Sequence, residues 1–181
     1  MRQTTGTETV RICITGRVQG VGYRLWATRT ATGLGLRGWV RNRADGSVEA
    51  LVTGEAQDVA AMVQAAQRGP PAAQMIAGLK QMAVRAHSRG IKIIGATLTP
   101  FGNETYMANA WNPQREEVRT TVNDWVRDGG AFDAVADFDK ALRDPERSTQ
   151  MLTKYDCGDG LHPSDLGHNK MGDAIDLALF E

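Results

Sequence analysis

The fold of the first part of the chain is decided by the stretch Gly16-Arg17-Val18-Gln19-Gly20-Val21-Gly22-Tyr23-Arg24. It follows Val10–Ile14, which predicts a short strand, and leads into a helical pattern from Gly22 to about Ala31. Glycines allow backbone conformations that let successive N–H groups converge on one point. The helix N-terminus adds a partial positive charge, and Arg24 adds a permanently charged planar fork. The sequence therefore predicts a cradle for a phosphate-sized anion, formed by Gln19, Gly20, Val21, Gly22, Tyr23 and Arg24.

Three further elements extend this strand and helix into a β-α-β-β-α order. Leu36–Asn42 and Ser47–Thr53 alternate as strands do, and Ala44-Asp45-Gly46 between them contains the Asp-Gly pair of a tight hairpin turn. A helical pattern then runs from Gly54 to Gln67. One more strand would complete a ferredoxin-like sandwich. The first part of the chain is thus expected to be α+β.

The rest of the chain alternates helix and strand after a break at Arg68–Gln74. Helices are predicted over Met75–Arg89, Arg115–Arg127 and Asp165–Phe180, and strands over Ile91–Thr97 and Phe132–Asp137. This alternation is typical of an α/β fold with a parallel sheet. Because the composition and pattern change at Gln74-Met75, we expect two domains, one over 1–74 and one over 75–181. The fold class expected for the whole chain is α/β (α+β).

Composition limits the classes of partner. The 181 residues carry 23% charged and 41% hydrophobic residues, as ordinary globular proteins do. A net charge of zero argues against nucleic acid as the main partner, although residues 1–74 carry nine arginines and five acids. No secretory signal or membrane-length apolar run is visible, so we expect a cytoplasmic protein without membrane contact. The two cysteines do not form a disulfide framework, and Cys13 is expected to be buried.

Arg24 and Asn42 are the candidate catalytic residues of the first part. The loop and Arg24 would hold a phosphoryl group, and the Asn42 amide, at the end of a predicted strand, could hold an attacking water. If the leaving group is the carboxylate of an acyl phosphate, it departs without a strong general acid. Residues 1–74 contain no histidine, which fits such a site. The alternative is a glycine-rich turn with a surface arginine and a strand-end asparagine.

Gly16–Arg24 and Gly38-Trp39-Val40-Arg41-Asn42 resemble the two signature segments of the acylphosphatase family, and Asp45–Ala50 with Gly54-Glu55 is similar to it as well. The resemblance covers residues 9–74. It implies that Arg24 binds phosphate, that Asn42 orients the water, that the substrate is a small anionic acyl phosphate and that no cofactor is used. The family's final strand, which lies beside the first one, is missing after Gln74. The first strand is then expected to be an open edge.

The segment Gly33-Leu34-Gly35-Leu36-Arg37-Gly38 fits the G-x-G-x-x-G fingerprint of dinucleotide-binding proteins. It follows a predicted helix and precedes a strand, whereas the fingerprint requires the opposite order. We therefore interpret it as a helix end and a turn.

Asp159 and His162 are the candidate catalytic pair of the second part. Their spacing on a glycine-rich loop would let Asp159 orient the imidazole of His162 as a general base. The alternative is a turn before a helix that Ser164 or Asp165 caps. Asp137 and Asp139 could touch a metal ion, but a strand-end carboxylate pair is more often solvated, so no metal site is predicted.

The block Asp159-Gly160-Leu161-His162-Pro163-Ser164, with Gly95–Phe101 and Phe132–Asp139, resembles the C-terminal half of flavodoxin-like SGNH (GDSL-type) hydrolases over residues 75–180. The half that would carry the nucleophilic serine in a Gly-Asp-Ser block is absent, and no Gly-Asp-Ser occurs in this sequence. Asp159 and His162 therefore look like an orphaned pair.

Three hypotheses follow for the function. The first, which we favour, is cofactor-free hydrolysis of acyl phosphates. The second is an SGNH-type esterase remnant built on His162 and Asp159. The third is a catalytically impaired fusion, or chimera, of two partial domains. The sequence does not predict the oligomeric state. The fold itself separates the first and third hypotheses, because Ile91–Thr97 could pair with Val10–Ile14 in place of the missing strand.

Overall fold

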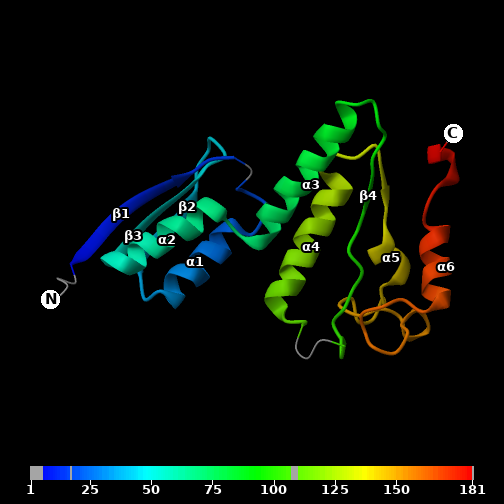
Figure 1. Ribbon diagram of the computed structural model, residues 1–181. Helices are drawn as coiled ribbons and strands as arrows, with labels where there is room; N and C mark the ends of the chain where they lie inside the picture. Colours follow the sequence, from blue (N-terminus) through cyan, green and yellow to red (C-terminus); the bar gives the residue numbers. More distant parts are fainter. Residues whose placement is uncertain (1–5, 17, 107–109, 181) are drawn as a thin grey trace. The chain divides into compact units, whose positions relative to one another are not determined.

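The computed structural model describes residues 6–16, 18–106 and 110–180 of the chain. These residues divide into two compact units, Met1–Ala77 and Gly78–Glu181. Each unit has its own sheet and is described by itself below (Figure 1). The predicted α/β (α+β) class is confirmed.

The first unit begins with the predicted β-α-β-β-α order. Its elements are β1 (Thr7–Ile14), α1 (Tyr23–Gly33), β2 (Arg37–Asn42), β3 (Val48–Glu55) and α2 (Ala56–Arg68). The three strands form an antiparallel sheet in the order β1-β3-β2, and Figure 1 shows α1 and α2 on one face of it. This arrangement is a truncated ferredoxin-like fold.

The register of the sheet brings the ends of β1 and β2 together. Ile14, the last residue of β1, and Asn42, the last residue of β2, both lie opposite Val48 of β3. The loop that follows β1 and the asparagine that ends β2 therefore share one end of the sheet.

The two faces of this sheet differ in chemistry because strand side chains alternate. Val48, Ala50 and Val52 of β3 point into the core. Glu49 points to the opposite face, where Arg11 of β1 and Arg41 of β2 bind its carboxylate, and its side chain is only 1% exposed. The prediction that Cys13 is buried is wrong, since Cys13 is exposed. Cys13 lies two residues after Arg11 and so shares this open face.

The first strand has no partner on its outer side in the described part of the chain. β1 pairs with β3 alone, so the predicted open edge is confirmed. The segment predicted over Ile91–Thr97 does contain a strand, β4 (Ile94–Ala96), but β4 pairs in parallel with β5 (Ala134–Ala136) in the sheet of the second unit. It does not replace the missing strand.

The predicted break at Arg68–Gln74 is shorter than expected. α2 ends at Arg68, and α3 (Pro71–His87) starts after only Gly69 and Pro70. Proline is tolerated in the first turn of a helix, where its missing N–H has no partner to lose, so Pro71 begins α3 instead of preventing it. Residues 71–77 of α3 belong to the first unit and the rest to the second.

The second unit is built on the parallel pair β4 and β5, with α4 (Pro113–Asp128) between them in the sequence. α5 (Phe138–Leu142), the 3₁₀ turn η1 (Thr153–Tyr155), α6 (Asp165–Asp173) and a second 3₁₀ turn, η2 (Leu177–Phe180), follow. The prediction of one closing helix over Asp165–Phe180 is wrong at its end. Asp176 accepts a hydrogen bond from the backbone N–H of Ala178, which starts a separate turn. None of the helices described here is long and apolar enough to cross a membrane.

Candidate functional site

The loop between β1 and α1 adopts the glycine-dependent conformation that its sequence predicts. Gly16, Gly20 and Gly22 have φ angles of 97°, 74° and 70°, which residues with side chains rarely adopt. Gly22 is the N-cap of α1, and its carbonyl accepts the N–H of Trp26 at 3.0 Å. Val18 and Val21 are buried and anchor the loop. Arg17 lies outside the described residues.

Several backbone donors of the loop are available to a ligand. Within the described ranges, the N–H groups of residues 19–22 have no recorded intramolecular acceptor. They precede the N-terminus of an α-helix, where N–H groups and the helix dipole favour an anion. The side chain of Arg24 is exposed in the first turn of the same helix. Donors and positive charge are therefore found together at this end of the unit.

Gln19 ties the loop to the hairpin that carries Asn42. Its Nε2 donates to the carbonyl of Arg43 at 2.8 Å and to the carbonyl of Ser47 at 3.0 Å. Arg43 directly follows Asn42, whose side chain is exposed. The clamp therefore holds the loop against the end of β2, so the loop that leads to Arg24 and the strand end that carries Asn42 lie at the same end of the sheet.

Tyr23 has a structural contact that its place in the loop did not indicate. Its hydroxyl donates to the carbonyl of Ala66 in α2 at 2.6 Å, and its ring packs edge-on against Trp26 at 5.1 Å. Burial raises the pKa of Tyr23 to about 12. The Tyr23 side chain thus fastens α1 to α2, and only its backbone is left to contribute to the cradle.

Asp159 and His162 form the predicted pair in the second unit. His162 Nδ1 lies 2.7 Å from Asp159 Oδ2, and Asp159 Oδ1 accepts the backbone N–H groups of Leu161 and His162. The hydrogen bond with the His162 ring, together with these backbone donors, holds the pKa of Asp159 far below its usual value. The ring of Tyr106 packs edge-on against His162 at 5.3 Å. The imidazole is therefore oriented, with Nε2 left for a reaction partner.

Within the residues that the structure describes, no hydroxyl group contacts the His162 ring, but the free thiol of Cys157 lies within 4.8 Å of the Asp159 carboxylate. The recorded side-chain contacts of His162 there are with Asp159 and Tyr106 alone. The nearby Ser164 donates to the carbonyl of Lys154 and accepts the N–H of Gly167, so it caps α6. The interpretation of this segment as a capped turn before a helix is thus also correct.

Asp137 and Asp139 are not the solvated pair that the sequence suggested. The Asp139 side chain is 2% exposed and pairs with Arg119 at 2.7 Å and with Arg127 at 2.6 Å. Asp137 binds Arg127 through both of its oxygens and accepts the Thr97 hydroxyl at 2.9 Å. The arginines lie on α4, so this network joins α4 to the end of β5 and neutralises both carboxylates. Its role is to hold the second unit together.

Comparisons with known proteins connect these two sites to two families. A family model described as acylphosphatase matches residues 10–89. The chain is 51% identical over 78 residues to an acylphosphatase of Rhodopseudomonas palustris, covering 42% of this chain and 79% of the relative. It is 56% identical over 68 residues to an acylphosphatase of Rhodospirillum rubrum, covering 38% and 75%. A second model, described as GDSL-like lipase/acylhydrolase, matches residues 55–175. The chain belongs to both families.

The acylphosphatase and GDSL matches are longer than the resemblances in the sequence indicated, and they overlap over residues 55–89. The acylphosphatase match continues past Gln74 into residues that are helical, as α3, in this structure. Among solved structures, an acylphosphatase from Bacillus subtilis is 41% identical and covers 36% of this chain and 72% of its own, with a TM-score of 0.35. The acylphosphatase family thus covers the N-terminal part of the chain, and a GDSL-like part follows.

Proposed function

We propose that the first unit hydrolyses acyl phosphates to a carboxylate and phosphate without a cofactor. The observation that carries the proposal is the Gln19 clamp, which holds the anion loop against the end of the strand that carries Asn42. The identity to proteins named acylphosphatase supports it. The cytoplasmic location and the lack of nucleic-acid and membrane partners stay predictions.

Each group in this site has one task. The backbone N–H groups of Gln19–Gly22 and the Arg24 guanidinium would hold the phosphoryl oxygens and stabilise the charge that they carry in the transition state. The Asn42 side-chain amide would hold a water in line with the bond to be broken. The water oxygen attacks phosphorus, the bond from phosphorus to the acyl oxygen breaks with its electron pair, and the carboxylate leaves. Both protons of the water stay on the phosphate, which forms as dihydrogen phosphate while the carboxylate leaves unprotonated.

Turnover of benzoyl phosphate tests this assignment. We expect the wild-type protein to release benzoate and phosphate, and Arg24→Ala and Asn42→Ala each to lower kcat/KM by about 100-fold or more, as the loss of a transition-state donor does. Arg89→Ala removes an exposed arginine of the second unit and should leave kcat/KM unchanged. A metal chelator should have no effect. Activity that survives Arg24→Ala would remove the proposal.

β1 lacks a strand on its outer side in the described part of the chain, so the third hypothesis is a catalytically impaired fusion. The same assay tests this hypothesis. If folded wild-type protein turns over neither benzoyl phosphate nor acetyl phosphate, the loop and Asn42 are retained without activity, and the chain is a catalytically impaired chimera. Circular dichroism of the assayed sample separates this result from simple unfolding. Turnover by the wild type would instead show that three strands are enough to hold the loop.

The oriented Asp159–His162 pair favours a second candidate, an esterase remnant of the SGNH type in the second unit. In serine esterases the nucleophilic serine provides most of the rate advantage, so a pair without that serine should be nearly inactive. We expect hydrolysis of p-nitrophenyl acetate to be the same for wild type and His162→Ala. A loss of activity in His162→Ala would instead reveal a nucleophile that acts with this histidine.

A further inference from the structure

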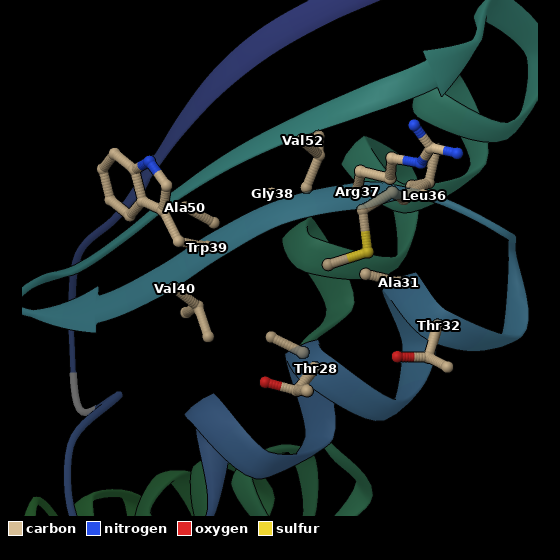
Figure 2. A pocket seen from close by; sticks show the side chains of 12 residues that line it. Thr28, Ala31, Thr32, Leu36, Arg37, Gly38, Trp39, Val40, Ala50 and Val52 are labelled. Carbon is tan, nitrogen blue, oxygen red and sulfur yellow. The ribbon is translucent and has the colours of Figure 1, made fainter.

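A cavity of about 90 Å³ lies between α1 and β2 in the first unit. Small and apolar residues line most of it, among them Ala27 and Ala31 of α1, Val40 of β2, Ala50 and Val52 of β3, and Met62 of α2. Figure 2 shows Val40 pointing from β2 toward α1, while the Trp39 and Arg37 side chains point away from α1. Thr28 and Thr32 add hydroxyl groups to the wall, so the interior is mainly apolar and no charged side chain points into it.

Two residues of the cavity wall, Thr28 and Val40, lie close along their elements to Arg24 and Asn42 of the proposed phosphate site. Thr28, on its wall, lies one helical turn after Arg24, and its hydroxyl donates to the Arg24 carbonyl at 3.0 Å. Val40 lies two residues before Asn42 and so on the same face of β2. One helical turn spans about 5.4 Å, and two strand residues span about 6.8 Å. These spans are comparable with the length of a short acyl chain on a phosphoryl group held by Arg24.

The residues that face the cavity from β2 and α1 include several small ones. A Cβ on Gly38 would lie 1.8 Å from the carbonyl oxygen of Leu51, so no larger residue can occupy that position on the cavity wall. Opposite the strand, α1 presents alanines at positions 27 and 31, which leave room between helix and sheet. Neither element can close the gap without a larger side chain on α1.

We propose that this cavity binds the acyl group of the substrate and selects short aliphatic acyl phosphates, such as butyryl phosphate, over ones with a charged tail. The inference rests on the proposed acylphosphatase function and adds the substrate class to it. Burying methylene groups against an apolar wall is favourable in free energy. A carboxylate placed there would lose its hydrating water without gaining a hydrogen-bond or ionic partner, which is unfavourable. The volume is smaller than the ~150 Å³ of a cavity that holds benzene, which favours a chain of few carbons.

Three substrates test the selection: acetyl, butyryl and succinyl phosphate. For the wild type, we expect kcat/KM for butyryl phosphate to exceed that for acetyl phosphate by about 10-fold or more, and succinyl phosphate to be the poorest of the three. Ala31→Leu fills the cavity and should bring the butyryl-to-acetyl ratio close to one while acetyl phosphate turnover is kept. Ala60→Leu, the same change on the exposed side of α2, should keep the wild-type ratio.

A second variant covers the case in which Ala31→Leu does not fold. Thr32→Leu places the same side chain at the exposed rim of the cavity and should also lower the ratio. If the wild type shows no butyryl preference, or if both folded variants keep it, the acyl site is overturned while the phosphate site stands. If no acyl phosphate is turned over in an Arg24-dependent way, the proposed function fails and the acyl site fails with it.

Discussion

Tyr23 shows how a residue within a ligand loop can have a purely structural side chain. It lies between Gly22, the N-cap of α1, and Arg24, the candidate phosphate ligand. Its hydroxyl satisfies the carbonyl of Ala66 near the end of α2. Because Arg24 is the next residue, the direction in which the arginine leaves the helix depends on this anchor.

Tyr23→Phe is expected to destabilise the first unit by about 1–3 kcal/mol, since the buried carbonyl of Ala66 loses its donor. Urea unfolding measures this loss. Tyr106→Phe is the matched control, because the Tyr106 side chain is highly exposed and its substitution should change stability by less than about 0.5 kcal/mol. Equal unfolding of Tyr23→Phe and wild type would show that the hydrogen bond contributes nothing.

Single residues also show where prediction from the sequence stops. The conformation of the loop was predictable, because a strand-to-helix turn that needs positive φ angles has glycines at those positions in the sequence. The clamp by Gln19 was not, since its acceptors lie 24 and 28 residues further along the chain. Asp139 was misjudged for the same reason, because the two arginines that approach its carboxylate most closely, Arg119 and Arg127, are on α4. Local pattern predicts conformation, and long-range partners decide what each polar group does.

At the scale of elements, β1 and β3 differ in how well they are held. β3 is paired on both sides, by β1 and β2, whereas β1 has a single neighbour in the described part of the chain. The strands themselves were predictable from alternation. The three-residue strands β4 and β5 were predicted too long, since only part of each apolar run finds a partner.

Hydrogen exchange tests this difference between strands. We expect the amides of β3 to be the most protected of the sheet, because opening them requires the loss of two ladders, and those of β1 to exchange faster. Mass spectrometry of peptides from Thr7–Ile14 and Val48–Glu55 measures both rates. Equal protection would mean that another strand covers β1 in solution, and repeating the measurement at several protein concentrations would tell whether that strand comes from a second copy.

At the scale of the whole molecule, the two units should respond separately to acid. In the second unit, burial alone would raise the pKa of Asp137, but hydrogen bonds from Arg127, the Lys140 amide and Thr97 outweigh it and bring the pKa to about 2. Because this is below the ordinary value of 3.8, ionised Asp137 stabilises the fold above about pH 4, and the contribution is lost as the pH falls through about 2.

Asp137→Asn should therefore lower the melting temperature of the second unit at pH 7. The difference in melting temperature between this variant and the wild type, here called the gap, should become smaller as the pH falls from about 5 to about 2. Scanning calorimetry across this range measures the gap. Asp128→Asn, at an exposed position near the end of α4, should show almost no gap at any pH. A gap of constant size for Asp137→Asn would mean that the charge of this carboxylate is not what stabilises the unit.

Inorganic phosphate should stabilise the unit that carries the anion loop. Phosphate at ten times its dissociation constant adds about 1.4 kcal/mol to the stability of the state that binds it. If the units unfold in two transitions, the transition lowered by Tyr23→Phe should move upward with phosphate, and the one lowered by Asp137→Asn should not. Arg24→Ala should abolish the shift. A shift of the other transition would place the anion site in the second unit.

All three strands of the first sheet come from Thr7–Glu55, and α2, the second of the two helices that cover them, ends at Arg68. In a ferredoxin-like domain that has its last strand, the sheet is complete only after that strand has been synthesised. Here the sheet and its helices are complete once α2 has left the ribosome. Because N-terminal domains fold first during synthesis, we expect the loop between β1 and α1 to form while the GDSL-like part is still being translated.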